Sequence, residues 1–310
     1  MLKEIEVAMY RIGIVSCDKW KNKIIEDILL KEELTSMGHN AEIISWQQPL
    51  NNNYDILILR SVWGYQNDYS NFKKWLISLN DKKIKIVNDV DLIINNIDKF
   101  RQFEILKKYN KSIIKTVFLK DYIADFQSLE EKINSIKSDL CVIKPSISGS
   151  GENTFLFSKT NKLIDIPNFI KKDEVLKKIN IILEKNDDCR IMIQPYIKEI
   201  NSGEYSCIFI DGNLSHVMLR FPNVFHEKKQ PYIINEVPKC IMDLAMAIEK
   251  IPEYSNYLYM RVDIVIQNGI AKVMEVELAE PDLLTRYVDT YEKQNEIIKS
   301  LSEGLERRIK

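Results

Sequence analysis

The sequence is poor in cysteine and histidine and has no long apolar run. Its five cysteines are scattered without a CxxC pair, an odd count at wide spacing that disfavours both a disulfide framework and a structural zinc site. Three histidines are too few and too dispersed for a histidine-based metal cluster. No stretch approaches the roughly 20 apolar residues of a membrane span, and acids interrupt the start where a signal peptide needs an apolar segment. We therefore expect a cytoplasmic protein, and any metal site should use carboxylates.

Glycine and an excess of one charge are also lacking. Only nine of the 310 residues are glycine, and neither GxGxxG nor GxxxxGK[ST] occurs, so the usual dinucleotide and P-loop fingerprints are absent. The 44 basic and 45 acidic residues leave a net charge of −1, which creates no overall field for nucleic acid or membranes. What is present is the composition of a folded protein, with 45% hydrophobic and 29% charged residues. The length predicts two or three domains.

Apolar runs alternate with amphipathic stretches over the first ninety residues. The segments YRIGIVSC and YDILILR predict strands, and the stretch between them that ends at Gly38 predicts a helix. Strands alternating with helices favour an open parallel sheet, whose ligands bind beyond the carboxyl ends of the strands. Arg60 and Trp63 follow such a strand and are candidate substrate contacts. A solvated arginine beside a surface aromatic cluster explains them equally well.

The pattern changes again beyond residue 200. Two hairpins are predicted there, with turns at Asp211-Gly212 and near Asn268-Gly269. We therefore predict an α/β protein in three parts: an N-terminal parallel-sheet domain (1–95), a central domain (96–197) and a C-terminal α+β domain with an antiparallel sheet (198–310).

A lysine and a loop of small residues form the first chemical signal. Lys144 interrupts the apolar strand CVIKP, where an unpaired ammonium group is costly to bury, so it needs an anionic partner or a route to water. The segment SISGSGENT follows, with Gly149 and Gly151. Backbone N–H groups of such a loop can contact phosphate oxygens, with the lysine as a point charge, although Ser-Gly loops mostly form ordinary turns.

The strongest signal is a set of acids on two neighbouring strands, MRVDIVI and KVMEVEL. Residues two apart in a strand share a face, so Glu275 and Glu277 project together, as do Arg261 and Asp263. Three converging carboxylates need cations to neutralise them, and oxygen ligands are those that Mg²⁺ takes. An exposed sheet face whose acids alternate with buried residues is the simpler alternative.

Convergence of these acids makes a demand on the turn between the strands. A plain two-residue turn at Asn268-Gly269 would place Asp263 opposite Met274, on the face away from Glu275. The metal site therefore requires an odd loop or a β-bulge, and we predict a three-residue loop with Gly269 in the left-handed region. That geometry also brings Arg261 to the same face.

Several segments resemble, in order, the ATP-grasp superfamily: KFRQFEIL after Asp98-Lys99, VIKPSISGSGENT, IMIQPYI, GEYSCIFIDGNLSHVMLR, MRVDIVIQNG and MEVELAEP. The similarity spans roughly residues 98 to 284 and is greatest to the glutathione-synthetase-like branch, which includes the D-cycloserine ring-closing ligase. It implies an ATP-grasp fold in which the central part is a lid, with ATP and Mg²⁺ between the central and C-terminal parts. It further implies an ADP-forming ligase, in which a carboxylate attacks the γ-phosphate and an amine attacks the resulting acyl phosphate.

The resemblance also implies roles for individual residues. Lys99 and Lys144 would contact the phosphates, Ser148, Gly149, Ser150 and Gly151 would form the loop over them, and Gln194, Tyr196 and Ile197 would hold the adenine edge, through the Gln194 carbonyl and the Ile197 N–H. Asp263, Glu275 and Glu277 would hold the magnesium ions, and Arg220 and Arg261 would face the transferred phosphoryl group and the substrate carboxylate. Such chemistry needs positioning and charge neutralisation more than a covalent side chain.

The expected substrates are small-molecule or peptide carboxylates and amines, with neither nucleic acid nor membrane as a partner. Two departures fall in the substrate half of the resemblance: Gly64 stands where relatives carry an acid, and FPNVFHEKKQPY lacks an expected element. A nucleotide-binding regulatory or scaffold protein and a small-molecule kinase remain alternatives to the ligase. A homodimer stays open as the oligomeric state.

Overall fold

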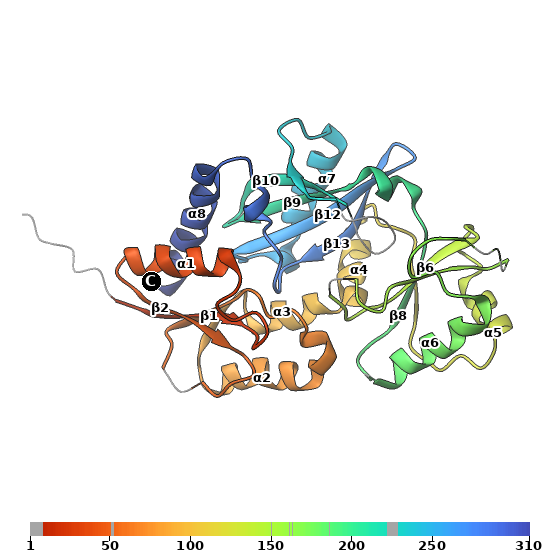
Figure 1. The fold of residues 1–310 in the computed structure, drawn as a ribbon, viewed down its shortest axis with the longest axis horizontal. Helices are drawn as coiled ribbons and strands as arrows, with labels where there is room; N and C mark the ends of the chain where they lie inside the picture. The colour runs from red at the N-terminus through yellow and green to blue at the C-terminus, as the bar shows by residue number, and fades with distance from the viewer. Residues whose placement is uncertain are drawn as a thin grey trace, which may run out of the picture.

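The structure is a computed structural model that describes residues 9–50, 53–149, 151–160, 162, 164–185, 187–221 and 229–310. In these residues the strands form three sheets, which follow one another along the chain (Figure 1). The N-terminal sheet lies beside the C-terminal one, and the central sheet lies at the far end of the molecule from α1. None of the helices in the described part of the chain is long and apolar enough to span a membrane.

The N-terminal sheet is open and parallel, with the order β2-β1-β3-β4, as the alternating pattern predicts. Its elements are β1 (Arg11–Ser16), α1 (Ile25–Ser36), β2 (Asn40–Ser45), β3 (Ile56–Leu59), the 3₁₀ turn η1 (Tyr65–Asp68), α2 (Tyr69–Asp81) and β4 (Lys85–Val87). Gly38, just past α1, has a φ of 90°, the left-handed conformation that closes many helices.

Two helices lead to the central sheet, which is antiparallel in the order β5-β8-β6-β7. The elements are α3 (Val90–Ile97), α4 (Lys99–Lys108), β5 (Val117–Leu119), α5 (Phe126–Ile133), β6 (Leu140–Pro145), β7 (Phe155–Ser158), α6 (Lys172–Lys185) and β8 (Ile191–Pro195). The Asp98 carboxylate caps α4 by accepting from the Phe100 N–H at 3.1 Å, which fixes Lys99 in the first turn.

The C-terminal sheet is antiparallel in the order β11-β10-β9-β12-β13. Its elements are η2 (Lys198–Ser202), β9 (Glu204–Ile210), β10 (Asn213–Arg220), β11 (Tyr232–Ile233), α7 (Lys239–Glu249), η3 (Pro252–Tyr254), β12 (Tyr259–Gln267), β13 (Ile270–Glu277), η4 (Thr285–Tyr287) and α8 (Tyr291–Ile309). The last helix returns to the N-terminal sheet, where Leu301 and Leu305 share a core with Leu30 and Leu34 of α1. This helix ties the first and last parts of the chain together in one core. The domain boundaries near residues 95 and 197 remain predictions.

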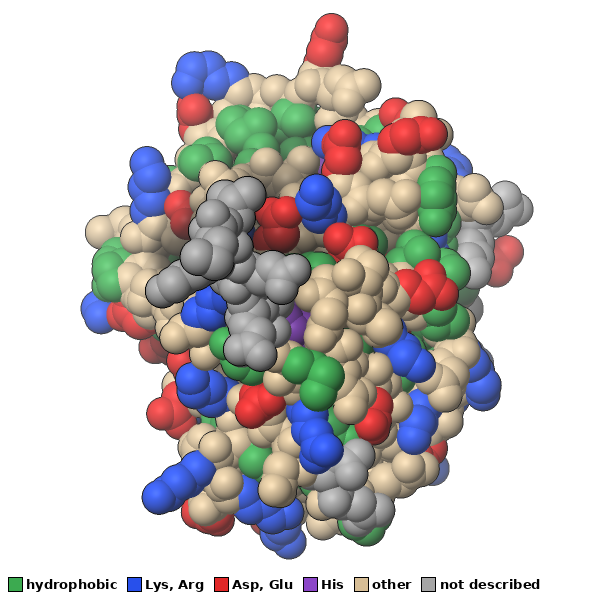
Figure 2. Space-filling view, turned by 90° about the vertical axis from the view of Figure 1, so that its left-hand side faces the viewer, with side chains coloured by type: hydrophobic (Ala, Val, Ile, Leu, Met, Phe, Trp, Pro, Cys, Tyr) green, Lys and Arg blue, Asp and Glu red, His purple; other side chains and the backbone are tan. Residues whose placement is uncertain are grey.

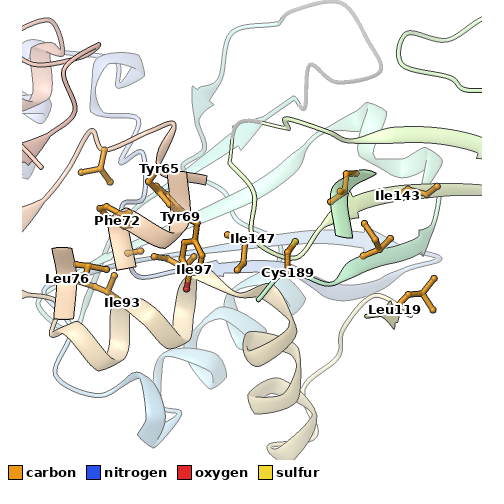
Figure 3. Close-up of a cluster of buried hydrophobic side chains, with 14 of the residues drawn as sticks. Tyr65, Tyr69, Phe72, Leu76, Ile93, Ile97, Leu119, Ile143, Ile147 and Cys189 are labelled. Atoms are coloured by element: carbon orange, nitrogen blue, oxygen red, sulfur yellow. The ribbon is translucent and has the colours of Figure 1, made fainter. Parts of the chain in front are cut away.

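A second core joins the N-terminal and central parts. Tyr65 and Phe72 stack with ring centroids 4.9 Å apart, and Ile147 and Cys189 of the central part belong to the same buried cluster (Figure 3). Buried apolar contact of this kind fixes η1 beside the loop that follows β6. The surface is different: on the face in Figure 2 acidic and basic side chains are intermixed, in keeping with the near-zero net charge.

Candidate functional site

A β-bulge on β13 aligns the predicted metal ligands. The turn at Asn268 and Gly269 is a two-residue one, with both φ angles positive at 51° and 76°, so the predicted three-residue loop is wrong. The register shifts instead after Asp263: Ile264 pairs with Val273 but Asp263 pairs with Glu275, which leaves Met274 as the extra residue. The bulge therefore reverses the parity, as the alternative to an odd loop requires.

The three carboxylates converge as the metal hypothesis demands. Asp263, Glu275 and Glu277 each offer an oxygen within 4.8 Å of the others. Asp263 is buried and accepts from the Ser206 hydroxyl on β9 at 2.7 Å. A set of carboxylate oxygens in this arrangement fits Mg²⁺, which binds few protein carboxylates and completes its shell with water and phosphate oxygens.

Two arginines balance part of this negative charge. Arg261 Nη2 lies 2.9 Å from Asp263 and 2.9 Å from Glu277, and Arg220 Nη2 lies 2.8 Å from Asp263. Arg220 also pairs with Glu204 at the start of β9. Burial raises the pKa of Asp263, but the two arginines outweigh it and hold the pKa at about 2. The predicted pair Arg220 and Arg261 therefore lies at the carboxylates, as expected of groups that face a phosphoryl group.

The pKa of Glu277 is shifted in the opposite direction from that of Asp263. Burial raises its pKa to about 8. The charge of Arg261 lowers the pKa, and the negative charge of the neighbouring Glu275 raises it further. A carboxylate surrounded by other carboxylates is costly to ionise unless a cation is added. A divalent ion at this position would remove that cost.

The two predicted lysines, Lys99 on α4 and Lys144 on β6, lie on the side of the carboxylates that the central part of the chain forms. Lys99 Nζ lies 2.8 Å from Glu275 and donates to the Ser148 carbonyl at 2.9 Å. Lys144 on β6 has no ion-pair partner within 4.0 Å in the described part of the chain, and burial lowers its pKa. Lys144 is half-buried, and an ammonium group without an ion-pair partner in such a place is a costly feature that a phosphate would satisfy.

A cavity of about 690 Å³ runs from these lysines toward β8. This volume lies within the range of roughly 300 to 1,000 Å³ that is typical of ligand pockets. The following predicted site residues line it: Lys99, Lys144, Ser148, Gly149, Gly151, Gln194, Tyr196, Ile197, Arg220, Arg261, Glu275 and Glu277. Ser150, also predicted for the phosphate loop, lies outside the described residues.

The strand register decides which groups of the adenine edge are free. Between β6 and β8 the Tyr196 N–H donates to the Leu140 carbonyl at 2.9 Å, and the Ser146 N–H donates to the Arg190 carbonyl at 2.7 Å. In an antiparallel ladder every second pair of opposite residues is hydrogen-bonded. The Val142–Gln194 pair lies two residues from the Leu140–Tyr196 pair, so the backbone groups of Val142 and Gln194 bond to each other.

The Gln194 carbonyl expected at the adenine is therefore already engaged. The Gln194 amide is engaged too, because it donates to the Thr116 hydroxyl at 2.8 Å. The Pro195 carbonyl and the Ile197 N–H face the opposite edge of β8, beyond Val117, where the pairing with β5 ends. Both residues line the cavity, so this edge can still pair with a purine through Pro195 in place of Gln194.

A smaller cavity of about 230 Å³ adjoins the first on the side of the N-terminal sheet. Trp63, Gly64, Tyr65 and Gln66 form one wall. Its other lining residues include Glu275, Glu277, Arg220 and Arg261, together with Glu280, Asp282 and Arg286. Trp63 thus lies where the sequence predicts a substrate contact.

The structure does not bring Arg60 to either cavity. Its side chain is only 5% exposed, lies 3.8 Å from the buried Asp27 and donates to the Pro281 carbonyl at 3.3 Å. Arg60 therefore cannot contact a substrate in this structure, and it supports the wall of the smaller cavity instead. The strand-end rule places the residues after β3 near the site, but the side chain turns inward to pair with a charge on α1.

Sequence reasoning missed the acids and the arginine that follow β13. Glu280 lies in the segment MEVELAEP, three residues after Glu277, and this proximity was the available signal. Burial raises the pKa of Glu280 to about 7, although the nearby Tyr65 hydroxyl and the charges of Arg261 and Lys99 lower it. Asp282 and Arg286 form an ion pair at 2.7 Å that no strand or helix pattern indicated.

Comparisons with known proteins agree with this architecture. The family model for the N-terminal domain of D-cycloserine synthetase DcsG matches residues 12–88, and no curated protein matches the chain. The crystal structure of D-cycloserine synthetase DcsG superposes with a TM-score of 0.81 at 16% identity, covering 97% of this chain and 100% of that one. The chain has the ATP-grasp fold.

Two further solved structures support the same conclusion. D-alanine–D-alanine ligase from Bacillus anthracis complexed with ATP has a TM-score of 0.62 at 18% identity, covering 96% of this chain and 99% of that one. ATP-grasp ligase PsnB complexed with minimal precursor, Mg and ADP has a TM-score of 0.60 at 11% identity, covering 98% and 99%. The fold predicted from the ordered motifs is thus confirmed, and at such low identity the reaction must be argued from the site.

Proposed function

We propose that this protein is an ATP-dependent carboxylate–amine ligase that forms ADP and an amide or related bond. The observation that carries the proposal is the convergence of Asp263, Glu275 and Glu277 between Lys99 and the unpaired Lys144, at one end of a nucleotide-sized cavity. ATP-grasp neighbours include ligases crystallised with ATP or with Mg and ADP. Small-molecule or peptide substrates and a cytoplasmic location, where ATP and Mg²⁺ are plentiful, are part of this proposal.

The residues divide the work by charge. Asp263, Glu275 and Glu277 would hold Mg²⁺, which neutralises phosphate charge when bound. Lys144 would contact the phosphates from β6, and Lys99 would do so from the start of α4, while the Ser148–Gly149 backbone lies beside them. The Pro195 carbonyl and the Ile197 N–H would pair with the adenine edge.

Arg220 and Arg261 would act where the two cavities meet, since both line each of them. A substrate carboxylate in the smaller cavity would attack the γ-phosphate, breaking its bond to the β-phosphate oxygen and releasing ADP. An amine would then attack the acyl phosphate and expel inorganic phosphate. The arginines stabilise the charge that develops on the transferred group, which is the main requirement of phosphoryl transfer.

The test is to incubate the protein with ATP, Mg²⁺ and pooled amino acids and peptides, and to follow ADP, phosphate and product masses. A ligase forms equal amounts of ADP, phosphate and a condensed product. A phosphorylated product without free phosphate would identify a kinase, and ATP binding without turnover would identify a nucleotide-binding regulator. Glu275→Ala, which removes a central carboxylate, should abolish product formation while the folded state persists in circular dichroism.

A further inference from the structure

The smaller cavity contains a carboxylate, Glu280, that forms no ion pair with the described part of the chain. Glu275 pairs with Lys99, Glu277 pairs with Arg261, and Asp282 pairs with Arg286 at 2.7 Å. In the described part of the chain, no cationic side chain lies within 4.0 Å of Glu280, although Glu280 lines the cavity beside Tyr65. A partly buried carboxylate in such a position favours a cationic partner.

Glu280 is also separate from the metal-binding group. The carboxylates in the described residues that can converge on one ion within 4.8 Å are Asp263, Glu275 and Glu277, and Glu280 is not among them. The missing cation is therefore better supplied by a ligand than by the same magnesium site.

The backbone on both sides of Glu280 is held firmly. The Leu278 N–H donates to the Asn96 side chain at 2.7 Å, the Tyr259 hydroxyl donates to the Ala279 carbonyl at 3.2 Å, and Arg60 donates to the Pro281 carbonyl at 3.3 Å. Arg60 thus acts through the backbone beside Glu280. A carboxylate fixed in this way is preorganised for recognition, because little conformational entropy is lost when a ligand binds.

The size of the cavity restricts the ligand. About 230 Å³ corresponds to roughly eight water molecules at about 30 Å³ each, and it lies below the range of drug-sized pockets. Trp63 and Tyr65 close one side, and Tyr65 is buried and stacked on Phe72. A single amino-acid-sized molecule matches this volume.

Resting on the proposed ligase function, we infer that Glu280, which lines the smaller cavity together with Tyr65, binds the ammonium group of an amino-acid-sized substrate. The ammonium–carboxylate pair would hold the substrate at the end of the smaller cavity away from the nucleotide. The substrate's carboxylate would then be directed to Arg261 and Arg220, which line both cavities. Glu280 in this role decides specificity and takes no part in bond formation.

The test uses isothermal titration calorimetry on the full chain saturated with Mg²⁺ and AMP-PNP. The probes are the L- and D-amino acids and the N-acetyl derivative of each one that binds. We expect at least one free amino acid to bind and its N-acetyl derivative, which has no ammonium group, to bind at least about tenfold more weakly. Glu280→Gln should weaken the binding of the free amino acid about tenfold or more.

Glu104→Gln is the matched control, because it makes the same chemical change on an exposed acid of α4 that pairs with Lys107. It should leave the amino-acid affinity unchanged. Equal affinity of Glu280→Gln and wild type, equal binding of the acetylated and free forms, or binding of no amino acid at all would each overturn the inference. Failure of the wild type to bind Mg²⁺–AMP-PNP would instead overturn the proposed function, and unchanged AMP-PNP affinity in Glu280→Gln shows that this variant is folded.

Discussion

The larger and the smaller cavity share the carboxylates at the end of β13, but the rest of their surroundings differ. The larger cavity is built by strands of the central and C-terminal sheets, and its unbalanced group is the cation Lys144 on β6. The smaller cavity is closed by the segment that follows β3, from Trp63 to Gln66, and its group without an ion pair in the described part of the chain is the anion Glu280. A polyphosphate complements the first cavity, and an ammonium group complements the second.

The difference also shows how such a protein can change substrate without losing ATP. Two of the nucleotide groups, Lys144 and the Pro195 carbonyl, lie on strands whose register is set by sheet pairing, β6 and β8. The groups of the smaller cavity lie on connections, namely η1 and the segment after β13. Connections tolerate substitution better than paired strands, so the substrate side can diverge while the nucleotide side stays the same.

The largest expected effect comes from Lys144. Lys144→Ala should lower kcat/KM for ATP between about 100-fold and 1,000-fold, the range found when one preorganised charge-stabilising group is removed. The melting temperature should not fall, because the half-buried lysine has no ion-pair partner within 4.0 Å in the described part of the chain and its partial burial already costs free energy. Steady-state kinetics with ATP varied, together with thermal unfolding, measures both. Near wild-type turnover would remove Lys144 from the site.

Arg60 tests whether the wall of the smaller cavity is structural. Arg60→Ala leaves Asp27 buried without its partner, and loss of one member of a buried pair costs about 3 kcal/mol or more in the free energy of unfolding. Denaturant unfolding measures this cost. Adding Asp27→Asn should restore part of the stability, since no unpaired carboxylate then remains.

The cost at Arg60 should depend on pH. Burial raises the pKa of Asp27 to about 6, although Arg60 and Ser61 lower it, so the folded state binds a proton more tightly than the unfolded one. The stabilising contribution of Asp27 protonation to the free energy of unfolding is therefore fully present below about pH 4 and is lost as the pH rises through about 6. Without Arg60 its pKa rises further, and Arg60→Ala should be destabilised more at about pH 8 than at about pH 5. An equal loss of unfolding free energy at both pH values would show that the Arg60–Asp27 charge pair is not the cause of the destabilisation.

A smaller and more selective effect is expected from Trp63. Trp63→Ala opens the wall of the smaller cavity and should raise KM for the amino-acid substrate about tenfold, while KM for ATP stays within about twofold. The control is Trp20→Ala. The Trp20 ring packs edge-on against the Trp63 ring, with the ring centroids 6.1 Å apart, but Trp20 lines neither cavity. A larger change in KM for ATP than for the amino acid would mean that the two cavities are assigned the wrong way round.

The fold and the carboxylates could be predicted from sequence because both follow from local patterns. Strand and helix periods gave the parallel sheet, and the spacing of Glu275 and Glu277 placed them on one face. The bulge at Met274 could not be located, since the same parity results from a longer loop. Its position is decided by pairing with β12 and not by the turn residues.

Other features depend on contacts between distant segments. The return of α8 onto α1, the inward turn of Arg60 toward Asp27 and the meeting of Tyr65 and Glu280 in one cavity lining each join residues with no shared sequence pattern. The Gln194 carbonyl was misplaced for a similar reason, because its availability depends on the register between β6 and β8. Long-range pairing determines which groups are free, whereas sequence motifs indicate only which residues are near.

The smallest expected effect lies at the junction between the two cavities. Glu152, on the loop after β6, accepts from Gln66 at 2.8 Å and from Asn67 at 3.2 Å, and so joins this loop to η1. The carboxylate is exposed, and exposed polar pairs contribute about 1 kcal/mol or less. Glu152→Gln should therefore raise KM for ATP by less than about threefold. Hydrogen exchange should show the amides of residues 151–154 protected by Mg²⁺–AMP-PNP in the wild type and less so in this variant, because the nucleotide and η1 hold the loop from opposite sides. Protection that does not change with nucleotide in the wild type would show that the two cavities are not coupled through this loop.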